Sequence, residues 1–228
     1  LTKSDTRLIQ SFDSALLAAW KPFMTTREDI LTAAVEIFAE KGLDGASVRE
    51  ICQAAGTNSA SINYHFESKE ALYDATLGYL AAEHHDVWTR ALREAGPDPA
   101  RQLAAIVASD FDRKVCAHKK LAVWFAFWGQ AKYRPNYLKI HNRFDEERYE
   151  ELERICEALV AEGGYEAIAP KRAARSIEAM IDGLWLSMML YPATVDREDC
   201  LGDCFAALAL HFPRHFNQDG PLAKGVGA

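Results

Sequence analysis

Residues 47–72 read SVREICQAAGTNSASINYHFESKEAL. Ser47 and Glu50 are spaced as a capping box, in which the hydroxyl accepts from the Glu50 amide and the carboxylate accepts from the Ser47 amide. Apolar side chains then recur on one helical face up to Gly56, which can take the left-handed conformation that ends a helix. Ser68 is placed to cap another helix. We therefore predict two short helices joined by a tight turn and followed at once by a third, which is the layout of a helix-turn-helix.

The second of these helices is short and has little apolar surface, because it offers only Ala60 and Ile62 before Tyr64. Such a helix is poor at holding a fold together and well suited to the major groove of DNA. Its small polar residues are Thr57, Asn58, Ser59, Ser61 and Asn63. Lys69 stands in the first turn of the next helix, where a cation opposes the helix dipole. We therefore predict that Lys69 contacts a DNA phosphate.

This stretch resembles the DNA-binding domain of the tetracycline-repressor (TetR) family. The family pattern runs Ala-Gly-Val-Ser, then Tyr-x-His-Phe, then Lys-Glu-x-Leu. Here residues 55–58 read AGTN, residues 63–66 read NYHF and residues 68–72 read SKEAL. The family's usual tyrosine falls on Asn63, with Tyr64 beside it. Residues 27–42 fit as the preceding helix, with an apolar stripe that Gly42 ends.

The resemblance implies a division of roles among the residues of the motif. Tyr64, His65 and Lys69 would hold the DNA backbone. Four polar residues would face the bases: Thr57, Asn58, Ser59 and Ser61. Arg27, Ser47 and Asn63 complete the predicted DNA-binding set.

Composition indicates an ordinary globular protein with a reduced-thiol environment. The chain has 228 residues, 49% of them hydrophobic and 26% charged, which is enough for one or two domains. There is no run of about 18 apolar residues and no signal-peptide pattern, so we expect no membrane span. The five cysteines are scattered through predicted helices, which is typical of a cytoplasmic protein.

The net charge of −7 argues against indiscriminate binding of nucleic acids. Residues 25–72 hold only Arg27, Lys41, Arg49 and Lys69 against eight acidic groups. Specific binding remains feasible if these cations and helix N-termini face phosphates. The acidic balance also supports an alternative, a ligand-binding or protein-interaction module that has lost DNA binding. The small polar residues at 57–63 argue against that alternative.

The rest of the chain also predicts helices, so the expected fold is all-α. We expect a helix from Ser68 to the prolines at 97 and 99, and others near 99–117, 119–132, 136–162, 170–190 and 196–212. The expected organisation is an N-terminal extension at 1–24, a helix-turn-helix DNA-binding domain at 25–71, a larger ligand-binding and dimerisation domain at 72–216, and a flexible tail at 217–228.

The first 24 residues leave two alternatives open. Leu8, Ile9, Phe12, Leu16 and Trp20 could form an amphipathic helix with its own packing role, which would place Lys21 and Arg27 near DNA as an arm. The segment could instead come from a start upstream of the native one, because residues 24–29 look like a common beginning for the family.

The C-terminal half resembles the choline–betaine operon repressor branch of the same family. The resemblance rests on LAVWFAFWGQA at residues 121–131, a region around Arg143, and AMIDGLWL at residues 179–186. It implies a small-molecule effector site. The candidate ligand-binding residues are Trp88, Trp124, Phe125, Trp128, Asp182 and Trp185.

Aromatic faces attract quaternary ammonium groups, and a carboxylate in an apolar helix normally needs a partner. A cationic ligand could be the partner of Asp182. In the alternative, the tryptophans are core residues and Asp182 pairs with Arg143 or Arg148.

The resemblance also implies a homodimer in which the helices at 170–190 and 196–212 form a four-helix interface. Their apolar faces carry Ile177, Met180, Ile181, Leu184 and Met188, and Leu201, Phe205, Leu208 and Phe212. A two-fold dimer presents two recognition helices about 34–36 Å apart to a near-palindromic site on double-stranded DNA. We expect a transcriptional regulator, most simply a repressor.

Neither a metal site nor a catalytic site is expected. His84, His85, His211 and His215 are further potential ligands. Cys200 and Cys204 share a helical face, but no second pair of clear ligands completes a tetrahedral set with them. No phosphate loop, nucleophile elbow or HExxH string is present. The acids at 146–147 and 150–151 indicate a solvated helix face with Arg148 and Arg154 nearby. A hydrolytic enzyme is therefore the weakest alternative, and no cofactor is predicted.

Overall fold

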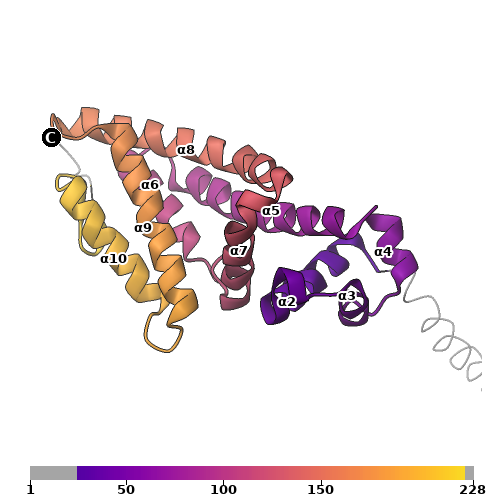
Figure 1. Ribbon diagram of the computed structural model, residues 1–228. Helices are drawn as coiled ribbons and strands as arrows, with labels where there is room; N and C mark the ends of the chain where they lie inside the picture. The colour runs from indigo at the N-terminus through magenta and orange to yellow at the C-terminus, as the bar shows by residue number, and fades with distance from the viewer. Residues whose placement is uncertain (1–24, 224–228) are drawn as a thin grey trace, which may run out of the picture. The chain divides into compact units, whose positions relative to one another are not determined.

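The computed structural model describes residues 25–223 of the chain. The expectations for residues 1–24, including the amphipathic helix and the Lys21 arm, lie outside the described residues. The chain divides into two compact units, Leu1–Thr76 and Leu77–Ala228, and each is described by itself. The regular secondary structure of the described residues is helical except for one two-stranded hairpin (Figure 1), which confirms the all-α prediction.

The first unit contains the predicted helix-turn-helix. Its helices are α2 (Arg27–Gly45), α3 (Val48–Ala54), α4 (Ser59–His65) and the beginning of α5 (Lys69–Ala95). Thr26 caps α2 with a full capping box, and helical geometry breaks at Gly42, where φ is 70°, as the sequence predicted. The core is built from side chains with relative exposures of 0–1%: Ile30, Ala34, Phe38, Ile51 and Leu72.

The second unit contains the remainder of α5 and five further α-helices among the described residues. These are α6 (Pro99–Asp110), α7 (His118–Gln130), α8 (Pro135–Gly163), α9 (Pro170–Leu190) and α10 (Arg197–His211), with a 3₁₀ turn η1 (Ala131–Tyr133) after α7. α8 packs against α6 and α9, and α9 also contacts α7 and α10. This packing buries the inner faces of α6, α8 and α9, which carry the residues of the cavity described below.

Two segments differ from the sequence-based expectation. The helix expected to run to residue 117 ends at Asp110, because the Val115 and Cys116 amides donate to the Asp112 carbonyl in a separate turn. The tail expected to fray from Asn217 instead forms a small hairpin, β1 (Phe216–Asn217) with β2 (Gly220–Pro221). Phe216 is buried, and β1 and β2 both contact α10. The hairpin is therefore packed against the second unit.

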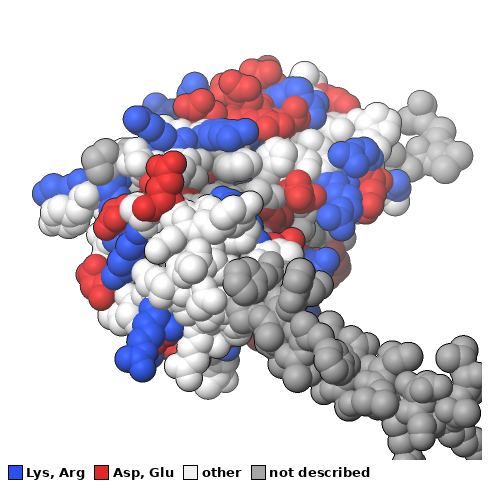
Figure 2. All heavy atoms as spheres, turned by 90° about the vertical axis from the view of Figure 1, so that its right-hand side faces the viewer, with Lys and Arg blue, Asp and Glu red and all other residues white. Residues whose placement is uncertain are grey.

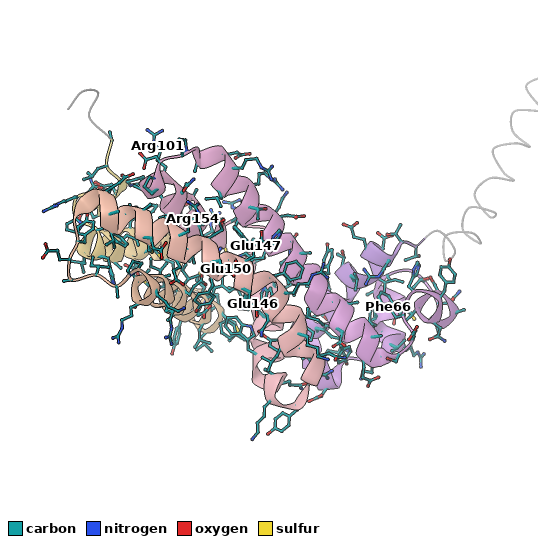
Figure 3. The ribbon with its side chains drawn as sticks, turned by 90° about the horizontal axis from the view of Figure 1, so that it is seen from above. Phe66, Arg101, Glu146, Glu147, Glu150 and Arg154 are labelled. Atoms are coloured by element: carbon teal, nitrogen blue, oxygen red, sulfur yellow. The ribbon has the colours of Figure 1, made fainter. Side chains whose placement is uncertain are left out.

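The acidic face of α8 is only partly as expected. Glu146, Glu147 and Glu150 are exposed along the helix (Figure 3), and Arg154 pairs with Glu151. Arg148, however, is buried, with only 4% of its side chain exposed. It was interpreted as part of the solvated face because acids surround it in sequence, but the helix turns it inward.

Candidate DNA-binding surface and ligand cavity

The start of α3 is fixed by the predicted capping box. The Ser47 hydroxyl accepts from the Glu50 amide at 3.3 Å, and the Glu50 carboxylate accepts from the Ser47 amide at 3.1 Å. Lys41 also donates to this carboxylate. The hydrogen bonds from Lys41 and then from Ser47 lower the pKa of Glu50 to about 2. Ser47 and Lys41 are therefore both engaged in holding α3 against the end of α2.

The turn between α3 and α4 follows from Gly56. With φ at 65°, Gly56 donates to the Gln53 carbonyl, and Thr57 donates to the Cys52 carbonyl, which together form a Schellman motif. Asn58 then caps α4, since its side-chain oxygen accepts from the Ser61 amide at 3.0 Å. Two successive caps thus set the direction in which α4 leaves α3.

α4 presents most of its residues to solvent. Ile62, 3% exposed, is its one buried residue and anchors it to the core. Five residues are exposed, namely Asn58, Ser59, Ala60, Asn63 and Tyr64, whereas Thr57 and Ser61 are half-buried. Tyr64 has a relative exposure of 85%, which is unusual for a large aromatic side chain. This is the surface composition expected of a recognition helix.

The other predicted phosphate contacts are held by neighbours within the first unit. His65 Nε2 lies 3.3 Å from the Thr25 carbonyl, so this nitrogen donates to the segment before α2. The Arg27 guanidinium lies 5.3 Å from the centre of the Phe66 ring, and Lys69 Nζ lies 5.2 Å from that of Tyr73. Both cations are exposed, so both can reach a phosphate while stacked on an aromatic ring.

Because Lys41 is paired with Glu50, three exposed cations of the motif remain: Arg27, Arg49 and Lys69. Arg49, on the first turn of α3, was absent from the predicted site. The sequence feature that could have identified Arg49 is its position in the first turn of the helix. There the free backbone N–H groups and the guanidinium both favour binding of an anion such as phosphate. On the face drawn in Figure 2, basic and acidic side chains are interspersed and form no continuous basic patch.

A cavity of about 240 Å³ lies within the second unit. It is lined by α5, α6, α7, α8 and α9. Of the predicted ligand residues, it brings together Trp124, Trp128, Asp182 and Trp185. The additional lining residues are His84, Asp110, Asp145, Arg148, Tyr149, Glu178 and Ile181.

Two predicted ligand residues do not line this cavity. Trp88 is 1% exposed and packs with His85 and the Arg148 guanidinium as core. Phe125 projects from α7 beside Trp128, with the rings edge to face at 4.9 Å. Neighbouring positions on α7 diverge by about 100°, so Trp124 and Trp128, four apart, face the cavity together and Phe125 does not.

The inner wall of the cavity is an ionic cluster centred on Asp110, whose side chain is 1% exposed. His84 Nε2 lies 2.7 Å from one carboxylate oxygen, and Arg148 Nη2 donates to the other at 2.6 Å. Arg148 Nε donates to Glu178 at 2.8 Å. Trp185 Nε1 donates to the Asp110 carbonyl at 3.1 Å. The cluster therefore joins α5, α6, α8 and α9.

Asp182 is not the buried, paired carboxylate that the sequence suggested. It is exposed at the cavity and makes no hydrogen bond or ion pair with the described residues. Arg148, which was one of two arginines that the alternative to a cationic ligand offered as its partner, is instead held by Asp110 and Glu178. The pKa of Asp182 is raised to about 6, first by loss of solvent and then by the negative charges of Glu178 and Asp110.

The cavity is acidic and aromatic together. It contains four carboxyl groups against Arg148 and His84, and its aromatic side chains are Trp124, Trp128, Tyr149 and Trp185. Burial raises the pKa of Glu178, an effect that the nearby Arg148 charge opposes. An added positive charge would relieve the repulsion among these carboxylates. The arrangement therefore suits a cation of modest size with an apolar surface.

In the part of the chain that the structure describes, the two cysteines weighed for metal binding are buried, and the four histidines each have a hydrogen-bond partner in the protein. Cys200 and Cys204 are 1% and 0% exposed, and burial raises the pKa of Cys204 to about 12. His215 Nδ1 lies 2.9 Å from the Tyr165 hydroxyl. Within residues 25–223, no group of three His, Cys, Asp or Glu residues could hold a metal ion. Nor does any helix in this range have the length and apolarity needed to cross a membrane.

Comparison with known families matches both units. Residues 30–76 match the family "Bacterial regulatory proteins, tetR family", and residues 99–213 match "BetI-type transcriptional repressor, C-terminal". The chain is 30% identical over 176 residues to the HTH-type transcriptional regulator BetI 2 of Chromohalobacter salexigens, covering 75% of this chain and 80% of that protein.

Solved structures show the same fold. A transcriptional regulator from Pseudomonas aeruginosa PAO1 aligns with a TM-score of 0.72 at 27% identity, covering 83% of this chain and 93% of that one. A regulator from Saccharomonospora viridis, solved in complex with choline, aligns with a TM-score of 0.71 at 19% identity, covering 81% of this chain and 95% of that one.

Proposed function

Because the chain belongs to the tetR family of bacterial regulatory proteins, with a BetI-type C-terminal domain, and is a DNA-binding transcriptional regulator, we propose a specific mode of regulation for it. We propose that it is a homodimeric repressor whose affinity for its operator is lowered by an organic cation. The observation that carries the proposal is the cavity, in which three tryptophans and a tyrosine stand with four carboxyl groups. Bacterial transcriptional regulators act on DNA in the cytoplasm, and we infer the same location for this protein. We also infer that it has no catalytic activity.

We propose a quaternary ammonium compound as the effector. Such a cation gains from the faces of Trp124, Trp128 and Trp185, on the order of 2 kcal/mol when desolvated, and from the charge of Asp182. The choline bound to the Saccharomonospora viridis regulator is a compound of this kind. Choline is therefore the first compound to test.

For DNA, we propose that Asn58, Ser59 and Asn63 face the bases, since they are the exposed small polar residues of the recognition region. Arg27, Arg49 and Lys69 would hold phosphates. Tyr64, which is exposed along most of its side chain, would lie against the sugar–phosphate backbone.

The helices α9 and α10 contact each other within one protomer. For the dimer, we propose an interface formed by the outer faces of these two helices. Four of the residues first suggested for it are buried inside the protomer, namely Ile177, Ile181, Leu208 and Phe212. The exposed face instead has small and apolar residues at helical spacing: Ala179, Gly183, Leu186 and Leu190 on α9, and Gly202, Ala206 and Leu210 on α10. A Cβ at Gly183 or Gly202 would meet no atom within 4 Å, so a second copy can approach there.

The proposed signal starts at the Asp110 cluster. A cation in the cavity would change the charge balance around Asp110 and Glu178. His84 of α5 lies 2.7 Å from Asp110, so a change at the cluster can act on α5. α5 begins at Lys69, directly after the recognition helix. The effector can weaken DNA binding only through its different affinity for the two states of the dimer, typically about 1–3 kcal/mol.

The test is selection of genomic DNA fragments on the purified protein at physiological salt, with and without choline. Recovery of one near-palindromic site that choline releases would support both the operator and the effector. Recovery that is insensitive to choline and other quaternary ammonium compounds would overturn the effector. No enrichment of any site would favour the alternative, a ligand-binding or interaction module that has lost DNA binding.

A further inference from the structure

Arg148 carries a donor that the protein leaves unused. Its Nε and Nη2 donate to Glu178 and Asp110, but Nη1 is buried and has no hydrogen-bond partner among the described residues. The side chain is only 4% exposed, and it lines the same cavity as Trp124 and Trp128. A buried donor without a partner normally costs free energy, and a charged one costs more than a neutral one.

We propose that Arg148 is a specificity residue that donates from Nη1 to a neutral hydrogen-bond acceptor, such as a hydroxyl, carried by the organic cation close to its positive centre. This inference rests on the proposed function and adds a second point of recognition to it. The aromatic and acidic wall binds the positive end of the ligand. The guanidinium distinguishes cations that have an acceptor from those of equal size that lack one.

The charges of the cavity favour a neutral acceptor over a carboxylate. The charge of Arg148 is already balanced by Asp110 and Glu178, which hold its other two donor positions. Asp145 and Asp182 add two further carboxyl groups to the lining. A ligand carboxylate would therefore meet repulsion that a hydroxyl avoids, while both can accept the hydrogen bond.

The first test compares three ligands on the full-length wild-type protein by isothermal titration calorimetry at pH 7.5. Choline has the hydroxyl, trimethyl(propyl)ammonium replaces it with a methyl group of similar size, and glycine betaine carries a carboxylate. A site built to bond a hydroxyl rejects the analogue without it, because the buried donor is then left unpaired. We expect trimethyl(propyl)ammonium to bind about tenfold to a hundredfold more weakly than choline, and betaine to bind more weakly than choline.

The possible outcomes separate this inference from the function on which it rests. Equal or tighter binding of trimethyl(propyl)ammonium would overturn the role of Arg148 and leave the cation site intact. Betaine as the tightest ligand would overturn the preference for a neutral acceptor. Failure of all three quaternary ammonium compounds to bind would overturn the proposed effector class and, with it, the inference.

The second test changes the donor. Arg148→Lys keeps the positive charge but removes the planar fork of donors, so the ratio of choline to trimethyl(propyl)ammonium affinity should fall to near one. The matched control is Arg154→Lys on the same helix (Figure 3), whose side chain is 51% exposed and pairs with Glu151. The control should keep the wild-type ratio. An unchanged ratio in a folded Arg148→Lys protein would overturn the proposal, and if that variant does not fold, the wild-type ligand series decides.

Discussion

Asn58 combines two functions in one side chain, because it caps α4 through its oxygen and is exposed on the proposed DNA surface. Asn58→Ala should relax base preference and also destabilise the protein by about 1 kcal/mol through loss of the cap. Asn58→Ser can still cap the helix, so it should lose base preference with little loss of stability. Urea unfolding and binding to cognate and scrambled DNA separate the two effects. A Ser variant that keeps full base preference would exclude Asn58 from base reading.

We expect the ionised Asp182 carboxylate to lower the stability of the ligand-free protein and to strengthen binding of a cationic ligand. Its pKa is raised from 3.8 to about 6, so its ionisation opposes folding above that pKa, and the opposition disappears as the pH falls below the ordinary value. Asp182→Asn should therefore stabilise the ligand-free protein at pH 7.5, by on the order of 1 kcal/mol because solvent screens this exposed group, and the gain should shrink towards pH 4.

The same substitution should weaken choline binding by roughly fivefold at pH 7.5, as expected for loss of a partly solvated ion pair. Wild-type affinity should itself fall as the pH is lowered through 6, where Asp182 takes up a proton. Thermal unfolding and calorimetry of both proteins between pH 4 and pH 8 measure these effects. A less stable variant with unchanged choline affinity would contradict the assignment.

At the scale of the elements, the turn between α3 and α4 depends on the backbone of Gly56. A Cβ there would meet no atom within 4 Å, but φ is 65°, a conformation that costs other residues about 1–2 kcal/mol. Gly56→Ala should destabilise the protein by that amount and lower DNA affinity by turning α4. Gly129→Ala is the matched control, since this glycine lies within α7 with open space and no positive φ, and should be neutral or stabilising. Urea unfolding of both variants is the measurement, and equal effects would show that conformation at Gly56 is unimportant.

Most of the helices followed from the sequence because their determinants are local, although the helix expected at 99–117 ends at Asp110. Ser47 with Glu50 and Gly56 form the predicted helix start and helix end, and α9 spans the predicted 170–190. The cavity was only partly predictable, because burial depends on the direction in which each helix faces. Arg148 was interpreted as solvated from its acidic neighbours, and Asp110 was not singled out, although a carboxylate in the apolar α6 carries the same signal as Asp182. Trp88 and Trp128 look alike in sequence, and only packing distinguishes core from cavity.

At the scale of the whole molecule, an acidic protein with few available cations should bind DNA with moderate salt dependence. Arg27, Arg49 and Lys69 are the exposed cations of the motif that are not paired with an acid, so a dimer would displace about six counterions. This gives a slope of log K against log salt of about −5. Lys69→Ala should make the slope shallower by about 2 and weaken cognate and scrambled DNA alike. Fluorescence anisotropy between 50 and 300 mM salt measures it, and a change confined to cognate DNA would assign Lys69 to base reading instead.

The proposed dimer makes the sharpest prediction at this scale. Leu186 and Leu210 are 39% and 85% exposed on the outer faces of α9 and α10, so Leu186→Glu combined with Leu210→Glu would bury two charges per protomer at a two-fold interface. The double variant should be monomeric in light scattering, keep its helical circular dichroism, and bind the operator about 100-fold more weakly, because each half-site is then bound independently. Leu138→Glu, on α8 with 54% of the residue exposed, is the matched control and should remain dimeric. A double variant that still forms dimers would place the interface elsewhere, whereas a monomer with undiminished operator affinity would show that DNA binding does not need the second copy.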